Sequence, residues 1–149
     1  MRFLFYDRIV EMQPGSRALA TKAISIGDEF LPEHYPLCPI MPPSLVLESV
    51  AQVAGWLYIV TQQFAISTVL GVVEGAAIAG DARAGQTLEV EAWMQYAHRD
   101  GATLRGVARV DGREILRVKR LVFASRPLTD PARIAEARQM FRYLGGEDA

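Results

Sequence analysis

The chain has 149 residues, of which 50% are hydrophobic and 22% charged, and its net charge is −1. These totals are typical of one soluble globular domain, and they exclude a protein whose overall charge would attract nucleic acid or another polyanion. The charge is uneven, because residues 1–98 sum to −5 and residues 99–149 to +4, a bias that suits an acidic partner but more often marks a solvated face.

The compartment is indicated by one cysteine and by two apolar stretches. Cys38 is the single cysteine, so no internal disulfide is possible, which is consistent with a reducing cytoplasm. We interpret it as a small packing residue rather than a reactive thiol. The N-terminal apolar run is cut by Asp7 and Arg8, unlike a signal peptide. Residues 45–73 are apolar enough to suggest a membrane helix, but Glu48 interrupts them, so we expect a buried helix of a cytoplasmic protein.

The first half of the chain predicts two strands and a long helix. Residues 6–12 and 17–26 read as strands that flank a turn at Gln13-Pro14-Gly15. Residues 29–41 contain three prolines, which predicts a loop without regular structure. A helix is expected to begin at Pro42-Pro43-Ser44, because proline suits a first helical turn, and to continue to about residue 64. It is apolar on nearly every face, so the rest of the domain must enclose it.

The second half predicts four more strands, at residues 68–78, 87–98, 103–110 and 115–124, with a hairpin turn at Asp111-Gly112. Residues 130–144 read as an amphipathic helix followed by Gly145, with an apolar stripe of Ile134, Ala137, Phe141 and Leu144. This inventory predicts an α+β fold in which a curved antiparallel sheet wraps around a long central helix. We expect one domain over residues 1–127 and a helical extension of it over residues 128–149.

One stretch carries the functional signal. Residues 34–48 read HYPLCPIMPPSLVLE, with His34 and Glu48 fourteen positions apart, and Ala51-Gln52 follow. This pattern resembles the signature of the hot-dog-fold 3-hydroxyacyl-[acyl-carrier-protein] dehydratases of the FabZ and FabA type. In that family a histidine in a His-Phe-Pro loop precedes a Glu or Asp on the central helix by the same interval. The resemblance extends over about residues 3–124, including Tyr6-Asp7-Arg8-Ile9 as the first strand and residues 104–113 as the late hairpin.

The resemblance implies a hot-dog fold and dehydration of 3-hydroxyacyl chains on acyl carrier protein to trans-2-enoyl thioesters. Glu48, rather than Asp, resembles the branch that does not isomerise its product. The resemblance also implies a homodimer, with further assembly of dimers possible in the family, in which His34 of one subunit faces Glu48 of the other. It implies no cofactor, metal, nucleic acid or membrane partner. The expected catalytic residues are His34 and Glu48, and the expected substrate-binding residues are Met41, Pro43, Ser44 and Gln52.

The residue types fit this chemistry on physical grounds. Removing water from a 3-hydroxyacyl thioester needs a base, an acid and donors for charge on the thioester carbonyl. Histidine titrates near neutrality and suits the base. A carboxyl group on an apolar helix can keep its proton and suits the acid, and N–H groups at a helix start suit the donors. Taken singly, His34 reads as a surface residue and Glu48 as a complement to the helix dipole; their joint spacing favours a site. His98, beside an expected turn at Arg99-Asp100-Gly101, is assigned no role.

The sequence departs from the family at three places. Leu37 and Pro43 stand where the family usually has glycine, and residues 78–84 replace a basic, proline-bearing strand. Pro43 has no N–H to offer the thioester carbonyl, and one lost oxyanion donor typically costs about 100- to 1000-fold in turnover. The Ser44 N–H or hydroxyl can substitute. Two readings therefore remain open: a dehydratase of a specialised lipid or polyketide-like pathway, and a non-catalytic hot-dog subunit that binds acyl thioesters or partners an active dehydratase. A hot-dog thioesterase is a third. Retention of His34 and Glu48 favours the dehydratase.

Overall fold

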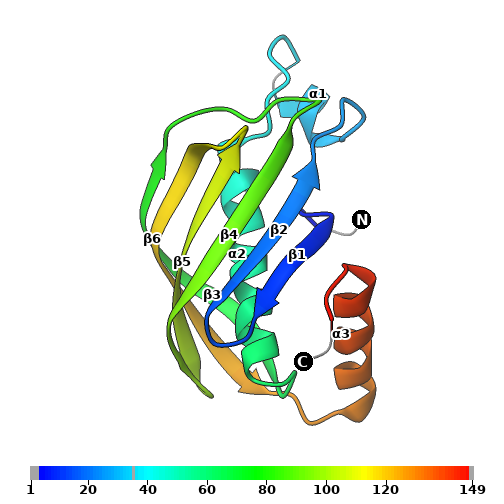
Figure 1. Cartoon of the computed structure of the whole chain (residues 1–149), viewed down its shortest axis with the longest axis vertical. Helices are drawn as coiled ribbons and strands as arrows, with labels where there is room; N and C mark the ends of the chain where they lie inside the picture. The colour runs from blue at the N-terminus through cyan, green and yellow to red at the C-terminus, as the bar shows by residue number, and fades with distance from the viewer. Residues whose placement is uncertain (1–3, 35, 148–149) are drawn as a thin grey trace.

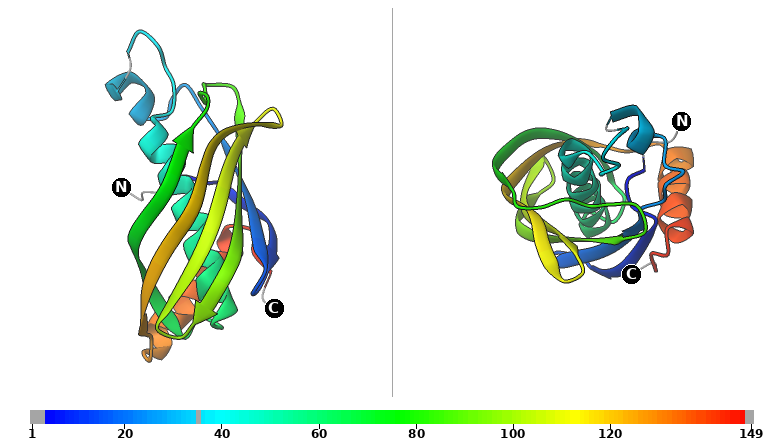
Figure 2. Two further views of the ribbon diagram at one scale, coloured as in Figure 1. Left: turned by 90° about the vertical axis from the view of Figure 1, so that its left-hand side faces the viewer. Right: turned by 90° about the horizontal axis from the view of Figure 1, so that it is seen from above.

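The computed structural model describes residues 4–34 and 36–147, over which a six-stranded antiparallel sheet curls around a long helix (Figures 1 and 2). The strands are β1 (Arg8–Gln13), β2 (Arg17–Ala23), β3 (Ile66–Ile78), β4 (Thr87–His98), β5 (Gly101–Val110) and β6 (Arg113–Pro127), in the spatial order β1-β2-β4-β5-β6-β3. The helices are α1 (Phe30–His34), α2 (Pro43–Thr61) and α3 (Pro131–Tyr143). The predicted α+β arrangement is confirmed.

The central helix α2 is enclosed because its surface is apolar on nearly every side. Ten of its 19 residues are buried, and it contacts β2, β3, β4, β5 and β6. Gly106 on β5 permits a close approach, since a Cβ at that position would overlap Cγ1 of Val50. By length and composition α2 could cross a membrane, but it is the buried core helix of the sheet. The expectation of a buried helix is therefore confirmed.

The predicted turn between β5 and β6 is also confirmed. Asp111 and Gly112 have positive φ angles of 52° and 73°, the backbone conformation that a two-residue hairpin turn needs. Glycine adopts this conformation without cost and aspartate tolerates it, so the dipeptide fixes the register of the two strands that it joins.

The segment before α2 differs from the prediction, because residues 30–34 form the short helix α1 within the expected loop. Pro32 is accommodated in the first turn, where its missing N–H removes no helical hydrogen bond. Leu31 is fully buried and anchors α1 to the core. Cys38 follows in the loop and is exposed, so its interpretation as a packing residue was wrong. Met41 then rejoins the core, and its N–H donates to the Ala82 carbonyl at 2.8 Å.

The C-terminal helix α3 packs beside the end of α2 that is remote from α1, next to β1 (Figure 1). Asp130 caps it by accepting a hydrogen bond from the Ala132 N–H at 2.9 Å. Phe141 is fully buried, with its ring 5.7 Å from that of Trp56 and 5.6 Å from that of Phe64. After α3, the Leu144 carbonyl accepts a hydrogen bond from the Ile9 N–H of β1 at 2.7 Å. The predicted terminal helix is confirmed, and its apolar stripe faces α2.

Strand β3 forms the other edge of the sheet. In the described residues it pairs with β6 alone, and it is 13 residues long. Its exposed side includes Val69, Val72 and Ile78, with 66%, 45% and 63% of their surface accessible. An apolar edge of this length is a surface on which another strand can pair.

Candidate active site

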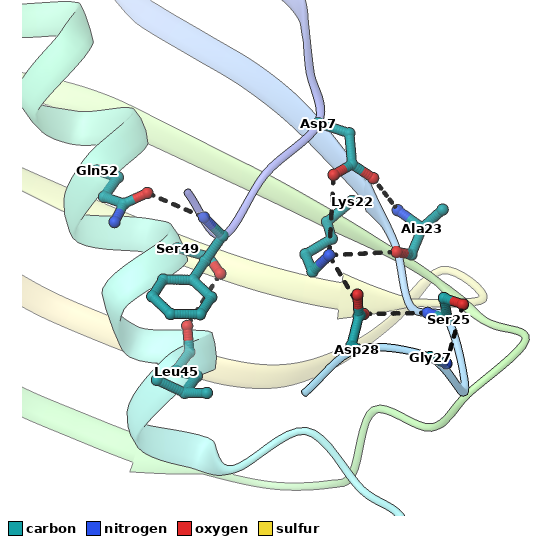
Figure 3. Close-up of polar contacts among 10 residues, drawn as sticks. Asp7, Lys22, Ala23, Ser25, Gly27, Asp28, Leu45, Ser49 and Gln52 are labelled. Carbon is teal, nitrogen blue, oxygen red and sulfur yellow. Dashed lines mark hydrogen bonds and ion pairs between the residues drawn. The ribbon is translucent and has the colours of Figure 1, made fainter. Parts of the chain in front are cut away.

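Glu48 lies in the second turn of α2, half-buried, and a neighbouring glutamine orients it. The Gln52 side-chain amide donates to Glu48 Oε1 at 2.9 Å, because residues four apart share one helix face. Gln52 Oε1 in turn accepts a hydrogen bond from the Phe5 backbone N–H at 3.1 Å (Figure 3). The N-terminal segment therefore fixes the amide of Gln52, which holds the carboxyl group of Glu48.

A cavity of about 230 Å³ opens beside these two residues. Its walls come from the segment before β1, from α2, and from β3 and β6, and apart from Glu48 and Gln52 they are mainly apolar, including Leu4, Trp56 and Leu70. The cavity thus presents one carboxyl group to a space suited to a hydrocarbon chain.

Tyr6 adds a polar group to the wall of this cavity. The residue is 1% exposed, and its hydroxyl has no hydrogen-bond partner of ordinary geometry among the described residues. Burial raises the pKa of Tyr6 well above its usual range, and the nearby Trp56 side chain lowers that pKa by less, so the phenol stays protonated and neutral. Sequence reasoning treated this residue only as part of a strand, because alternation does not reveal whether a buried hydroxyl finds a partner.

The first turn of α2 offers one backbone donor. The Leu45 and Val46 N–H groups both donate to the Pro42 carbonyl, at 2.9 and 3.1 Å, and Pro43 has no N–H. In the described structure the Ser44 N–H has no hydrogen-bond partner, and Ser44 is exposed. Of the predicted substrate-binding residues, Gln52 lines the cavity beside Glu48, whereas Met41, Pro43 and Ser44 do not border it.

His34 is the last residue of α1, and its side chain lies outside the described structure. The turn that leads to α1 is held by Lys22, whose side chain is 7% exposed. Lys22 Nζ lies 3.3 Å from Asp28 and 3.8 Å from Asp7, while Asp28 also accepts the Ser25 N–H at 3.1 Å (Figure 3). These contacts tie the turn before α1 to β2.

Sequence reasoning missed Lys22, although a signal was present. Along β2 the inward positions are Ala18, Ala20 and Lys22, so the alternation places a lysine on the apolar face. A buried lysine requires anionic partners, and Asp7 and Asp28 supply them.

Other titratable groups do not gather at this site. His98 is the exposed last residue of β4, and its Nδ1 is 3.2 Å from a carboxyl oxygen of Asp100 in the turn that follows. Within residues 4–34 and 36–147, no three His, Cys, Asp or Glu side chains are grouped so as to hold a metal ion.

Comparison with solved structures identifies the architecture. The protein smu.793 of Streptococcus mutans, solved bound to acetyl CoA, superimposes with a TM-score of 0.66 at 13% identity, covering 83% of this chain and 90% of that one. A hypothetical thioesterase of Streptococcus pneumoniae, solved with coenzyme A, gives a TM-score of 0.65 at 10% identity, covering 83% and 88%. At such identities the likeness concerns the fold alone, and the expected hot-dog fold is confirmed.

Comparison of sequences identifies the family. The 3-hydroxyacyl-[acyl-carrier-protein] dehydratase FabZ of Pediococcus pentosaceus is 34% identical over 113 residues, 75% of this chain and 76% of that protein. The enzyme of the same name from Thermomicrobium roseum is 32% identical over 130 residues, 87% of this chain and 85% of that protein. The model of the FabA-like domain matches residues 1–119. The chain therefore belongs to the FabA-like domain family and is a distant relative of the FabZ dehydratases.

Proposed function

We propose that this protein removes water from 3-hydroxyacyl thioesters carried on acyl carrier protein, giving trans-2-enoyl thioesters in the cytoplasm. The observation that carries the proposal is the carboxyl group of Glu48, oriented by Gln52 and facing a mainly apolar cavity, in a chain related to FabZ. A lone oriented carboxyl in a hydrocarbon-sized space suits proton transfer to a group at the end of an acyl chain.

In the proposed reaction His34 removes a proton from C2 of the acyl chain, and negative charge develops on the thioester oxygen. The electron pair then forms the C2–C3 double bond as the C3–O bond breaks. Glu48 donates its proton to the departing hydroxyl, which leaves as water. Proton exchange with solvent returns His34 to its neutral form and Glu48 to its acid form.

The charge on the thioester oxygen requires a donor that Pro43 cannot provide. The Ser44 N–H is the candidate, because it lies in the first turn of α2, has no partner within the described structure, and shares the positive end of the helix dipole. Ser44 would then take the place that a glycine fills in the family.

We also propose that the protein acts as a homodimer formed through β3. The long exposed edge of β3, with Val69, Val72 and Ile78 on its surface, supports pairing with the same strand of a second subunit. Such pairing would bring His34 of one subunit toward Glu48 of the other. Sedimentation at micromolar concentration should give twice the monomer mass, and a monomer would contradict this arrangement.

A second function, a non-catalytic subunit that binds acyl thioesters, is favoured by one observation. Pro43 removes a backbone donor at the start of α2, where a thioester oxygen would bind. Such a protein would keep the apolar cavity and bind acyl-carrier protein without forming product.

An assay of the purified protein distinguishes the two functions. It measures the enoyl product formed from 3-hydroxyacyl-carrier-protein substrates of several chain lengths. If the protein is a dehydratase, His34→Ala and Glu48→Gln should each abolish product formation with the fold intact. Glu48→Gln preserves size and hydrogen bonding but cannot deliver the proton.

Matched controls exist for both changes. The chain has two histidines, so His98→Ala is the control for His34→Ala. Glu89→Gln, at an exposed position of β4, is the control for Glu48→Gln. Both controls should keep native activity. Full activity in His34→Ala or Glu48→Gln contradicts the assigned roles, and substrate binding without product at any chain length supports the non-catalytic function.

A further inference from the structure

A second cavity, of about 380 Å³, lies beneath α3 at the end of α2 that is remote from Pro43. Trp56 and Ile59 of α2 form one side, Thr68 of β3 another, and Ala137 and Met140 of α3 a third. The charged residues of its border, Arg133 and Glu136, are exposed and lie at the rim. The space is therefore mainly apolar, and α3 forms one wall of it.

The two cavities adjoin each other. Trp56, Ile59 and Thr68 line both the space beside Glu48 and the space beneath α3. Together the two cavities form a mainly apolar path, referred to below as the course, along one face of α2 from the carboxyl group of Glu48 to Met140 of α3.

The length of this course can be worked out from the helix. Glu48 and Ile59 are 59 − 48 = 11 residues apart, which at 1.5 Å per residue spans about 16 Å. Each carbon of an extended hydrocarbon advances by roughly 1.3 Å, given C–C bonds of about 1.5 Å, so the course accommodates about twelve carbons. A chain that reaches α3 is therefore a long one.

We infer that the cavity beneath α3 binds the distal end of a long acyl chain, and that Ala137 and Met140 set the longest chain accepted. The inference rests on the proposed function of the Glu48 site and names its substrate class. The wall is held firmly, because Phe141 packs between the rings of Trp56 and Phe64, and Arg138 lies over Phe64 at 4.5 Å from the ring centre. A chain end thus meets a fixed surface.

The test enlarges one side chain of the wall. Ala137→Leu fills some of the cavity, and Ala135→Leu, at an exposed position on the same helix, adds the same group outside it. Substrates from roughly four to roughly sixteen carbons bracket the estimated length. We expect Ala137→Leu to lower the ratio of long-chain to short-chain kcat/KM by about tenfold or more, the scale of discrimination by bulk in an apolar pocket. Ala135→Leu should leave the ratio unchanged.

A binding measurement separates this inference from the proposed function. Trp56 lines both cavities, and the chain has one other tryptophan, Trp93. In the Trp93→Phe variant, tryptophan fluorescence therefore comes from Trp56 and reports the binding of acyl-pantetheine analogues. If no enoyl product forms but Ala137→Leu selectively weakens long-chain binding, the inference stands and the dehydratase proposal fails. If Ala137→Leu affects all chain lengths equally, or leaves long chains unaffected, the cavity does not hold the chain end and the inference is overturned.

Discussion

The position of α2 on the sheet depends on one glycine, and replacing it should be costly. In Gly106→Ala the new Cβ would overlap Cγ1 of Val50 and lie 3.2 Å from the Glu91 carbonyl oxygen. Val50 is fully buried, so neither group can move freely. Overpacking of a core costs typically about 1–3 kcal/mol, and alanine regains about 0.5–1 kcal/mol of the entropy that glycine loses in a strand. A net loss of about 1–2 kcal/mol in the free energy of unfolding is expected.

The cause can be isolated with a second substitution. Val50→Ala alone removes two methyl groups from the core and should cost about 2–3 kcal/mol. A Cβ at Gly106 would lie 3.7 Å from the Val50 Cβ, an ordinary contact, so the double variant loses the overlap with residue 50 and keeps only the 3.2 Å approach to the Glu91 carbonyl oxygen. Its stability should be close to that of Val50→Ala, which corresponds to a favourable coupling of about 1–2 kcal/mol.

Urea unfolding of the four proteins, analysed by linear extrapolation, measures this coupling. Losses that add within about 0.5 kcal/mol would refute the close approach of α2 and β5. Activity gives a second readout, because Val50 is two residues after Glu48, and a shift of about 1 Å in a catalytic group can cost about a hundredfold in rate. The double variant should recover some of the activity that Gly106→Ala loses.

Three further predictions concern the site. Tyr6→Phe should leave stability unchanged or raise it near neutral pH, because it removes a buried hydroxyl without a partner of ordinary geometry in the described structure. Burial raises the pKa of Tyr6, so the native protein should lose stability relative to this variant as pH rises above about 10, by up to about 1.4 kcal/mol per pH unit. If the free energies of unfolding of the two proteins change equally with pH, this prediction is wrong. Lys22→Met should loosen the turn before α1 and so lower kcat more than it raises KM. The exposed control Lys119→Met should change neither constant. Equal effects of the two substitutions would show that Lys22 does not position α1 for catalysis. Pro43→Gly should raise turnover by up to about 100-fold if a donor is missing, and should be neutral or harmful if the Ser44 N–H already serves.

The sheet and the central helix could be predicted because local rules decide them. Residues 87–92 alternate between polar and apolar side chains, and the observed β4 has the predicted bounds. Asp111-Gly112 specifies its own backbone conformation. By contrast, α1 was missed because three prolines usually exclude regular structure, whereas its stability comes from the burial of Leu31 against distant residues.

The candidate site was predicted in its residue types and only partly in its geometry. The interval from His34 to Glu48 and the helical spacing of Glu48 and Gln52 are properties of the sequence, and the second proved to be a hydrogen bond. The link from Gln52 to the Phe5 N–H joins residues 47 apart, and no local pattern encodes it. The cavity beneath α3 likewise depends on where the terminal helix packs. An amphipathic pattern predicts that a helix packs against an apolar surface, but it does not identify that surface.

The bond from the Ile9 N–H to the Leu144 carbonyl has a consequence for how many copies can associate. A sheet with two open edges can add subunits at both sides without limit, as fibres do, whereas a sheet with one open edge closes after a single pairing. The chain after α3 occupies the β1 edge and leaves β3 available. The C-terminal segment would thus oppose the pairing of a further strand at the β1 edge, which leaves β3 as the edge at which a second subunit can add.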